Sequence, residues 1–436
     1  MDEFIFSNYG FIISASLVLI ISFWFGELSR KTNIPSVLML IVLGILMKFG
    51  FDSLEYSDLN ILPILKVLGT VGLIMIVLEA ALELELKPEK YLPIAKAFVI
   101  ALIGLLLSIW VAAEVLEYFV EGMTTEQAWL YATPLSILSS AIIIPSVTGL
   151  VEWKKEFHIY ESTFSDILGI MIFYFLERRM HSGDHDTGGG GSNMEFALSV
   201  LATLVLAFVA SYLILLVFQN IKSHTKLFLL IAVLLLLYAV AKQARLSSLI
   251  IIFVFGLMMN NIPLFFKGRL SKWLKTHEAE HIYEGLHIIT METAFVVRTF
   301  FFVAFGMTIV LSDLANLNVV IVSVLIVASI YVIRWVLLRI FIGEDILPQL
   351  FIAPRGLITV LLFIAIPKDL EVAGFNKGIL LFVIIVTGVI MTIAMIQDKK
   401  RTGVAVNSAS SNPVGYEKWK APTIAEVVET DGGHGH

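Results

Sequence analysis

The chain has 436 residues, of which 58% are hydrophobic and 15% charged, with a formal net charge of −6 and no cysteine. Its mean hydropathy of +0.90 is far above that of a soluble domain, so we expect a polytopic membrane protein embedded in a lipid bilayer. The lack of cysteine excludes disulfides and thiolate metal sites. A pI near 5.9 offers no basic surface for nucleic acid.

Hydropathy predicts an all-α fold with about thirteen membrane-spanning helices. We expect them near residues 9–26, 34–50, 61–84, 96–119, 127–150, 160–177, 195–218, 226–241, 246–263, 287–311, 318–342, 349–367 and 378–396. The acidic N-terminus and the lack of a small-residue cleavage site after the first apolar run indicate that this run is kept as a span. Residues 1–396 then form the transmembrane domain, and 397–436 a short, polar, disordered cytoplasmic tail.

Basic residues gather in alternate loops. These loops carry Arg30/Lys31, Lys87/Lys90, Lys154/Lys155, Lys222/Lys226, Lys267/Arg269/Lys272/Lys275 and Lys399/Lys400/Arg401. The positive-inside rule therefore places the C-terminus in the cytoplasm and the N-terminus outside. Arg178/Arg179 and Lys242/Arg245 fall on the opposite side and do not fit this orientation.

Two expected spans, one in each half of the chain, carry helix-breaking residues. The fifth contains Pro134 and Pro145, and the twelfth contains Pro354 and Gly356. Proline removes a backbone donor and frees a carbonyl, which survives at membrane depth only where protein or water satisfies it. Kinked packing helices are the alternative for either span alone. The pair predicts an inverted-repeat transporter whose two interrupted helices cross at the midplane.

The stretch "ESTFSDILGIMIF" places an aspartate in the middle of the sixth expected span. Ser162 lies one turn before Asp166, Gly169 about one turn after it, and Ser165 adjoins it, so a small polar stripe faces one direction. A carboxylate at this depth is costly unless it faces a cavity, a partner or an ion. We interpret Asp166 as functional; the alternative is a buried aspartate that is protonated or paired for structure.

Other charged residues at membrane depth have candidate roles. Glu161 is expected near the cytoplasmic start of the Asp166 helix and Arg334 well inside its own span, and the two are expected to form a structural ion pair. Glu79 suits a functional or an interfacial role equally well. Arg298 and Arg355 are candidates for charge compensation, either holding the carbonyls of the broken helices or neutralising carboxylates, and the sequence does not choose between these roles.

Two polar segments carry histidines. The segment 181–193 contains His181, Asp184, His185 and Asp186, and we expect a solvated glycine-rich loop, with metal binding or pH sensing as the alternative. Residues 278–287 are expected to form an interfacial amphipathic helix before the tenth span, with a zinc site or a pH sensor as the alternative.

Five stretches resemble a known family. "GELSRKTNIPSVLMLIVLGIL", "LEAALELEL", "ESTFSDILGIMIF", "RTFFFVAFGM" and "PRGLITVLLFIAI" are similar, in order and spacing, to the monovalent cation/proton antiporters, most closely the NhaP-type sodium/proton exchangers. The resemblance covers roughly Gly26 to Met395. It implies a homodimeric transporter of a bacterial inner membrane, not an enzyme and without a cofactor, with a core bundle around the broken helices and a scaffold of other spans.

The resemblance also implies roles for single residues. Asp166 resembles the ion-binding aspartate, Ser162 an ion-ligand hydroxyl, Glu79 the acidic residue of the third span that faces the site, and Glu161 with Arg334 the stabilising pair.

The chain departs from the NhaP pattern in two places. Ser165-Asp166 stands where that pattern has Asn-Asp, and Ser140-Ala141-Ile142-Ile143 stands where it has Thr-Asp-Pro. The second stretch resembles the Kef-type potassium/proton branch, which in turn has two adjacent acids at positions 165 and 166.

The expected function is exchange of Na⁺, with K⁺ or Li⁺ as alternatives, for a proton at Asp166. Ser139, Ser140, Ser162 and Ser165 would add oxygen ligands, which suit a hard cation. One titrating carboxylate predicts electroneutral exchange. This prediction fails if Glu79 titrates together with Asp166. The alternatives are a proton-coupled symporter of an organic anion, which needs a cationic residue beside the substrate, and a degenerate transporter acting as a sensor or channel subunit.

Overall fold

The structure is a computed structural model that describes residues 8–32, 34–53, 62–86, 90–182, 191–221, 225–244, 248–265, 276–309, 311–343 and 345–411. Every regular element within these residues is a helix. The α-helices are α2 (Asn8–Thr32), α3 (Ser36–Ser53), α4 (Leu62–Glu83), α5 (Tyr91–Phe119), α6 (Thr125–Ser136), α7 (Ser140–Ser146), α8 (Glu152–Ser182), α9 (Gly191–Phe218), α10 (Lys226–Gln243), α11 (Ser248–Asn260), α12 (Ile262–Phe265), α13 (Thr276–Thr308), α14 (Leu317–Phe341), α15 (Leu357–Ala365) and α16 (Gly378–Ser411). Short 3₁₀ turns are η2 (Val147–Gly149), η4 (Leu311–Ala315), η5 (Gln349–Phe351) and η6 (Lys368–Leu370).

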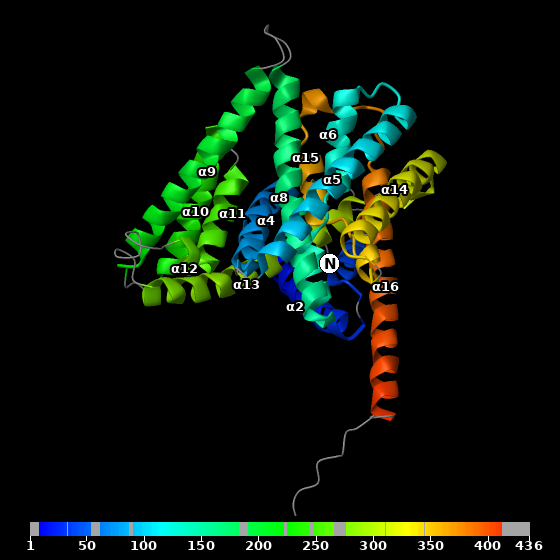
Figure 1. The fold of residues 1–436 in the computed structure, drawn as a ribbon. Helices are drawn as coiled ribbons and strands as arrows, with labels where there is room; N and C mark the ends of the chain where they lie inside the picture. The colour runs from blue at the N-terminus through cyan, green and yellow to red at the C-terminus, as the bar shows by residue number, and fades with distance from the viewer. Residues whose placement is uncertain are drawn as a thin grey trace, which may run out of the picture.

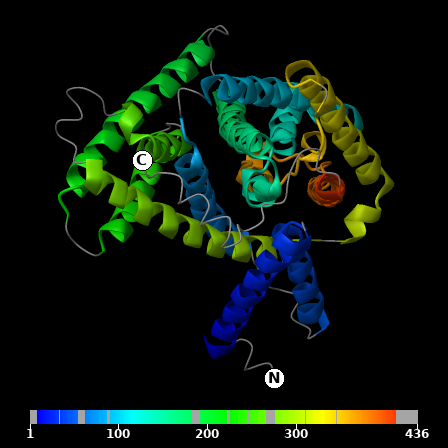
Figure 2. The ribbon, with the colours of Figure 1, turned by 60° about the horizontal axis from the view of Figure 1, so that its bottom comes forward.

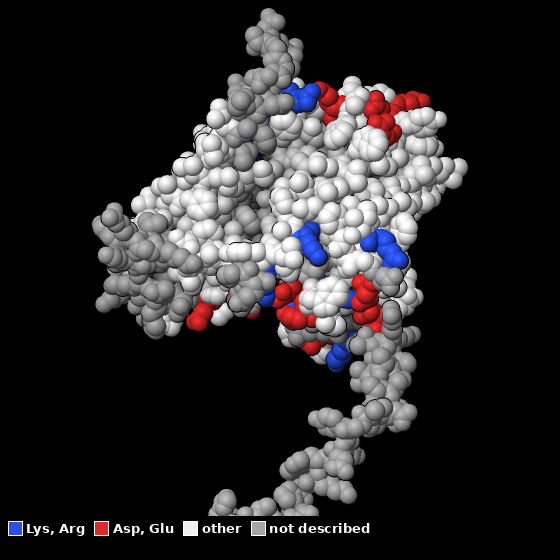
Figure 3. Space-filling view, viewed as in Figure 1, with Lys and Arg blue, Asp and Glu red and all other residues white. Residues whose placement is uncertain are grey.

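The expected all-α membrane fold is confirmed. Nine helical segments within the described ranges are long and apolar enough to cross a membrane. The other expected spans coincide with α3, α4, α11 and α15, so the count of thirteen crossings stays a prediction. Figure 3 shows a broad band of uncharged surface between two rims that carry charged side chains, which is the surface a bilayer requires.

The helices form two groups (Figures 1 and 2). In one, α9 and α10 pack against α11, which packs against α4; in the other, α5 packs against α6, α8 and α14, and α14 packs against α16. α13 contacts α3 and α4, and it runs beneath the first group toward the second (Figure 2). α4 and α13 thus face the group that contains the broken helices.

Both proline-containing spans are interrupted, as predicted. α6 begins with a capping box in which Thr124 and Gln127 bond reciprocally, and it ends at Ser136, after which the backbone is extended up to Ser139. In the second half, the turn η5 is followed by backbone without regular structure, and α15 begins only after Gly356. α8 packs against α6, α7 and α15, so one continuous helix lies alongside both interruptions.

Three helices run past the apolar segments that the sequence predicts. α8 begins at Glu152 rather than near 160, which places Glu161 inside the helix instead of at its start. The helix expected at 278–287 is not separate, because α13 runs without a break from Thr276 to Thr308. α16 continues to Ser411, past the expected apolar span at 378–396, which agrees with the apolar segment Gly378–Asp398. In each case polar residues extend a helix past its apolar part, where hydropathy gives no signal.

One exception to the expected charge pattern has a partner. Arg179, on the side where acidic loops are expected, lies 3.7 Å from Glu126. Both side chains are more than half exposed, so the pair is worth little in stability, but it offsets a positive charge at that end of α8.

Candidate functional site

The two interrupted helices touch at their breaks. The backbone N–H of Ser139 donates to the carbonyl of Pro354 at 3.0 Å. Gly356 packs so closely here that a Cβ built on it would lie 2.5 Å from Ser139 Oγ and 2.8 Å from Ile142 Cδ1. Glycine is therefore needed at this position for close approach, and the expected crossing of the broken helices is present.

Two adjacent side chains of α8 reach the break between α6 and α7. Asp166 Oδ2 accepts a hydrogen bond from the N–H of Ser140 at 3.3 Å, and Ser165 Oγ accepts one from the N–H of Leu138 at 3.0 Å. These donors belong to unwound backbone and to the first residue of α7, which lack helical partners. The sequence pattern around Asp166 thus meets the interrupted helix directly.

Oxygen atoms without hydrogen-bond partners gather beside this contact. Within the described residues, Ser139 Oγ, Ser140 Oγ and Asp166 Oδ1 are buried and have none. Buried polar atoms are normally satisfied, so three such oxygens on neighbouring residues indicate a place for a cation or a proton. Ser162 is not among these oxygens, because its hydroxyl donates to the carbonyl of His158 at 2.7 Å.

Arg355 holds the broken end of α6. Its guanidinium is fully buried and donates to the carbonyls of Leu135 at 2.9 Å, Ser136 at 3.1 Å and Ala353 at 2.8 Å. Its backbone N–H donates to Thr387 Oγ1 at 3.1 Å on α16. Of the two roles left open by the sequence, Arg355 thus binds broken-helix carbonyls.

Arg298 takes both of those roles. Its Nη2 forms an ion pair with Glu79 Oε2 at 2.8 Å, and its Nη1 donates to the carbonyl of Ala141 at 3.3 Å. Pro145 has no N–H, so the Ala141 carbonyl lacks its usual partner four residues later. Glu79 therefore contacts the region of Asp166 through Arg298, a link that the sequence analysis did not foresee.

Glu161 and Arg334 form a bidentate ion pair, with Nη1 to Oε1 at 2.6 Å and Nη2 to Oε2 at 2.8 Å. Both side chains are buried, and Arg334 Nε also donates to the carbonyl of Gln349 at 3.0 Å. His158, which the sequence analysis missed, lies one turn before Glu161 with its Nδ1 3.3 Å from Glu161 Oε2. Its i,i+3 spacing from Glu161 was the available signal.

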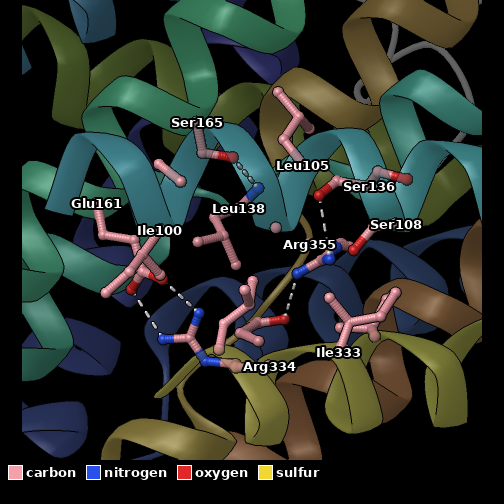
Figure 4. A pocket seen from close by; sticks show the side chains of 15 residues that line it. Ile100, Leu105, Ser108, Ser136, Leu138, Glu161, Ser165, Ile333, Arg334 and Arg355 are labelled. Atoms are coloured by element: carbon pink, nitrogen blue, oxygen red, sulfur yellow. Dashed lines mark hydrogen bonds and ion pairs between the residues drawn. The ribbon is translucent and has the colours of Figure 1, made fainter. Parts of the chain in front are cut away.

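A small cavity, lined mostly by apolar residues, lies between the ion pair and the end of α6 (Figure 4). It measures about 30 Å³, enough for a water molecule, and its polar lining includes Ser136, Ser165, Glu161, Arg334 and Arg355. Both arginines in the lining are already bonded, Arg334 to a carboxylate and Arg355 to carbonyls (Figure 4).

The two histidine-containing segments are separate from this site or outside the described structure. The side chains of residues 181–186 lie outside the described residues. Within 278–287, His281 is exposed and its Nδ1 is 3.7 Å from Glu284 Oε2, one turn along α13. This spacing is that of a surface ion pair on a helix.

The comparisons with known proteins agree with this geometry. The family model "Sodium/hydrogen exchanger, transmembrane" matches residues 13–397. A structure of the sodium proton antiporter MjNhaP1 from Methanocaldococcus jannaschii at pH 8 aligns with a TM-score of 0.63 and 17% identity, covering 90% of this chain and 97% of that one. An electron-microscopy structure of the same antiporter aligns at 0.59 and 18%, covering 95% and 100%.

At identities this low, the two structures establish the fold alone. A search of curated proteins finds no match. The family model, however, spans most of the sequence, and the chain belongs to the sodium/hydrogen exchanger family of membrane cation/proton antiporters.

Proposed function

We propose that the chain exchanges one monovalent cation, Na⁺ with K⁺ or Li⁺ as alternatives, for one proton at Asp166. The observation that carries this proposal is the buried Asp166 carboxylate, which has one oxygen on the N–H of Ser140 and the other without a partner among the described residues. The Ser139 and Ser140 hydroxyls beside it add neutral oxygens. Three oxygens on two elements suit a partly dehydrated alkali cation.

Exchange follows from the cost of burying one uncompensated charge. An empty, ionised Asp166 is expensive to carry through the membrane interior, whereas Asp166 with a proton or a monovalent cation is neutral. Only the two loaded forms cross, so a cation moves one way and a proton the other. Each half-cycle moves the same charge if Asp166 alone exchanges cargo, and transport is then electroneutral.

The other assigned residues support the site. Ser165 fixes the break by accepting from the N–H of Leu138, and Ser162 lies on the same face of α8. Glu161 with Arg334 holds α8 against α14, because the two residues belong to these helices.

We place the chain in a bacterial inner membrane with its N-terminus outside and its C-terminus cytoplasmic. The charge pattern of the loops supports this orientation. We further propose a homodimer that forms through the scaffold group of helices.

The alternatives are weaker. A symporter of an organic anion needs an available cationic side chain in a cavity of matching size. Arg355 lines a cavity of about 30 Å³, too small for an organic anion, and Arg298 is paired with Glu79. A sensor or channel subunit, suggested by the missing Thr-Asp-Pro pattern, would show no coupled exchange after purification.

The deciding experiment is ion-driven dequenching of a pH-sensitive dye in proteoliposomes that contain the purified protein. Li⁺, Na⁺, K⁺ and choline are each added outside vesicles with an acidic interior. We expect alkali cations to restore the fluorescence of the dye and choline to leave it quenched. A response to choline equal to that to Na⁺ would contradict cation exchange, and no response to any cation would favour the sensor.

A further inference from the structure

Glu79 and Arg298 form a pair that links the two groups of helices. Glu79 belongs to α4 and Arg298 to α13, whereas Ala141, the second partner of Arg298, belongs to α7. The side chains of Glu79 and Arg298 are each only 15% exposed. Ala141 directly follows Ser140, whose N–H binds Asp166, so this guanidinium lies one residue along the backbone from the site.

The local chemistry explains why an arginine is held here. Pro145 leaves the Ala141 carbonyl without a helical donor, and a guanidinium has enough N–H groups to serve a carbonyl and a carboxylate at once. The arginine therefore has a backbone acceptor that fixes its position independently of Glu79. A lysine, with a single nitrogen, would not hold both partners in this geometry.

We propose that Arg298 is a built-in counter-ion that keeps Glu79 out of the transported cation's ligand shell and thereby sets one-for-one exchange. This inference rests on the proposed function, because it concerns the same site. Of the two carboxylates, Asp166 lies at the crossing and Glu79 is linked to it through Arg298, which neutralises Glu79 permanently. The cargo has to neutralise only the other.

Charge balance gives the consequence for variants. Without the Arg298 charge, Glu79 needs a second positive charge from solution, so the number of charges moved per cycle changes or transport stops. Without the Glu79 charge, an uncompensated guanidinium remains beside the site and repels the cation. Removing both charges together restores the original balance.

The test compares wild type with Arg298→Gln, Glu79→Gln and the double variant, all purified and reconstituted. Na⁺-driven exchange gives the apparent Na⁺ affinity. A second assay holds pH and Na⁺ equal on both sides and applies a membrane potential through a K⁺ gradient with valinomycin. The same gradient without valinomycin measures any K⁺/H⁺ exchange, which is subtracted. Glu83→Gln is the matched control, because Glu83 lies one turn from Glu79 on α4.

We expect wild type and Glu83→Gln to move no protons under the potential. Glu79→Gln should weaken apparent Na⁺ affinity about tenfold, as expected for one uncompensated nearby charge. Arg298→Gln should either exchange Na⁺ for protons more slowly than wild type or move protons when the potential is applied. The double variant should regain exchange to within about threefold of wild type, without a response to potential.

Two results would overturn the inference: a double variant no better than Glu79→Gln, which would make Glu79 a direct ligand, or wild-type behaviour of Arg298→Gln. A single variant leaves one buried charge without a partner and can fold poorly. The double variant leaves none, so it can still be measured in that case. Potential-driven proton movement by wild type would instead refute the proposed stoichiometry, before any variant is considered.

Discussion

The N–H of Ser139 donates to the carbonyl of Pro354 at 3.0 Å, so the two interrupted helices bind each other through backbone atoms at their breaks. The free N–H at one break and the free carbonyl at the other satisfy each other. Non-helical backbone in a membrane needs hydrogen-bond partners from protein. Arg355, the residue after Pro354, then binds the last carbonyls of α6. The crossing is thus a bonded unit, and its geometry depends on how closely the chains approach.

The close approach at Gly356 can be tested with a single methyl group. Gly356→Ala would place a Cβ 2.5 Å from Ser139 Oγ, so the hydroxyl or the backbone has to move. We expect a loss of about 1–3 kcal/mol in stability and a larger loss of exchange, because Ser139 lies at the proposed cation site. Gly149→Ala is the control, since a Cβ there meets nothing within 4 Å. Equal thermal stability and exchange in the two variants would show that the contact does not matter.

Replacement of Asp166 tests the central carboxylate. Asp166→Asn keeps the shape and can still accept from the N–H of Ser140, but it neither carries a proton nor neutralises a cation. Exchange should fall to the level of empty liposomes, while expression and the size-exclusion profile stay near those of wild type. Substantial Na⁺- or K⁺-driven proton flux in this variant would remove Asp166 from the mechanism.

The buried pair of Glu161 and Arg334 should behave as a coupled unit. Removing one partner leaves an uncompensated charge, which typically costs about 3–5 kcal/mol, so Glu161→Ala and Arg334→Ala should each lower the thermal stability in detergent. The double variant should recover part of that loss. If the two single effects simply add, the residues do not interact in the folded protein.

Ser165 is expected to limit the cycle to one proton. Its hydroxyl accepts from the N–H of Leu138 and releases no proton at physiological pH, whereas an acid in its place adds a second titrating group beside Asp166. Ser165→Asp should therefore move protons when a potential is applied with valinomycin at equal pH and Na⁺. Ser165→Asn, which also keeps an acceptor, should behave like wild type. A response to potential in both variants, or in neither, would contradict this role.

Features that depend on local chemistry can be predicted from the amino-acid sequence. Apolar runs located the spans, because each helix in a bilayer must satisfy its own backbone and present an apolar surface. Prolines located both interruptions, because a missing N–H weakens a helix, although Pro134 and Pro145 themselves lie inside α6 and α7 and the break lies between them. Local chemistry also identified Asp166 as a candidate functional residue, because a carboxylate within an apolar run is costly unless it has a partner. Two opposite charges at membrane depth predicted the pairing of Glu161 with Arg334, and the family resemblance agreed with it.

Only the tertiary structure decided which partner each polar group takes. Arg298 and Arg355 look alike in sequence, yet one binds Glu79 and the Ala141 carbonyl and the other binds the end of α6. Glu79 and Arg298 are 219 positions apart, and their contact depends on how α4, α7 and α13 pack together. Hydrogen bonds and ion pairs of this kind require a few ångströms of precision between distant segments, and composition, periodicity and local propensity do not carry that information.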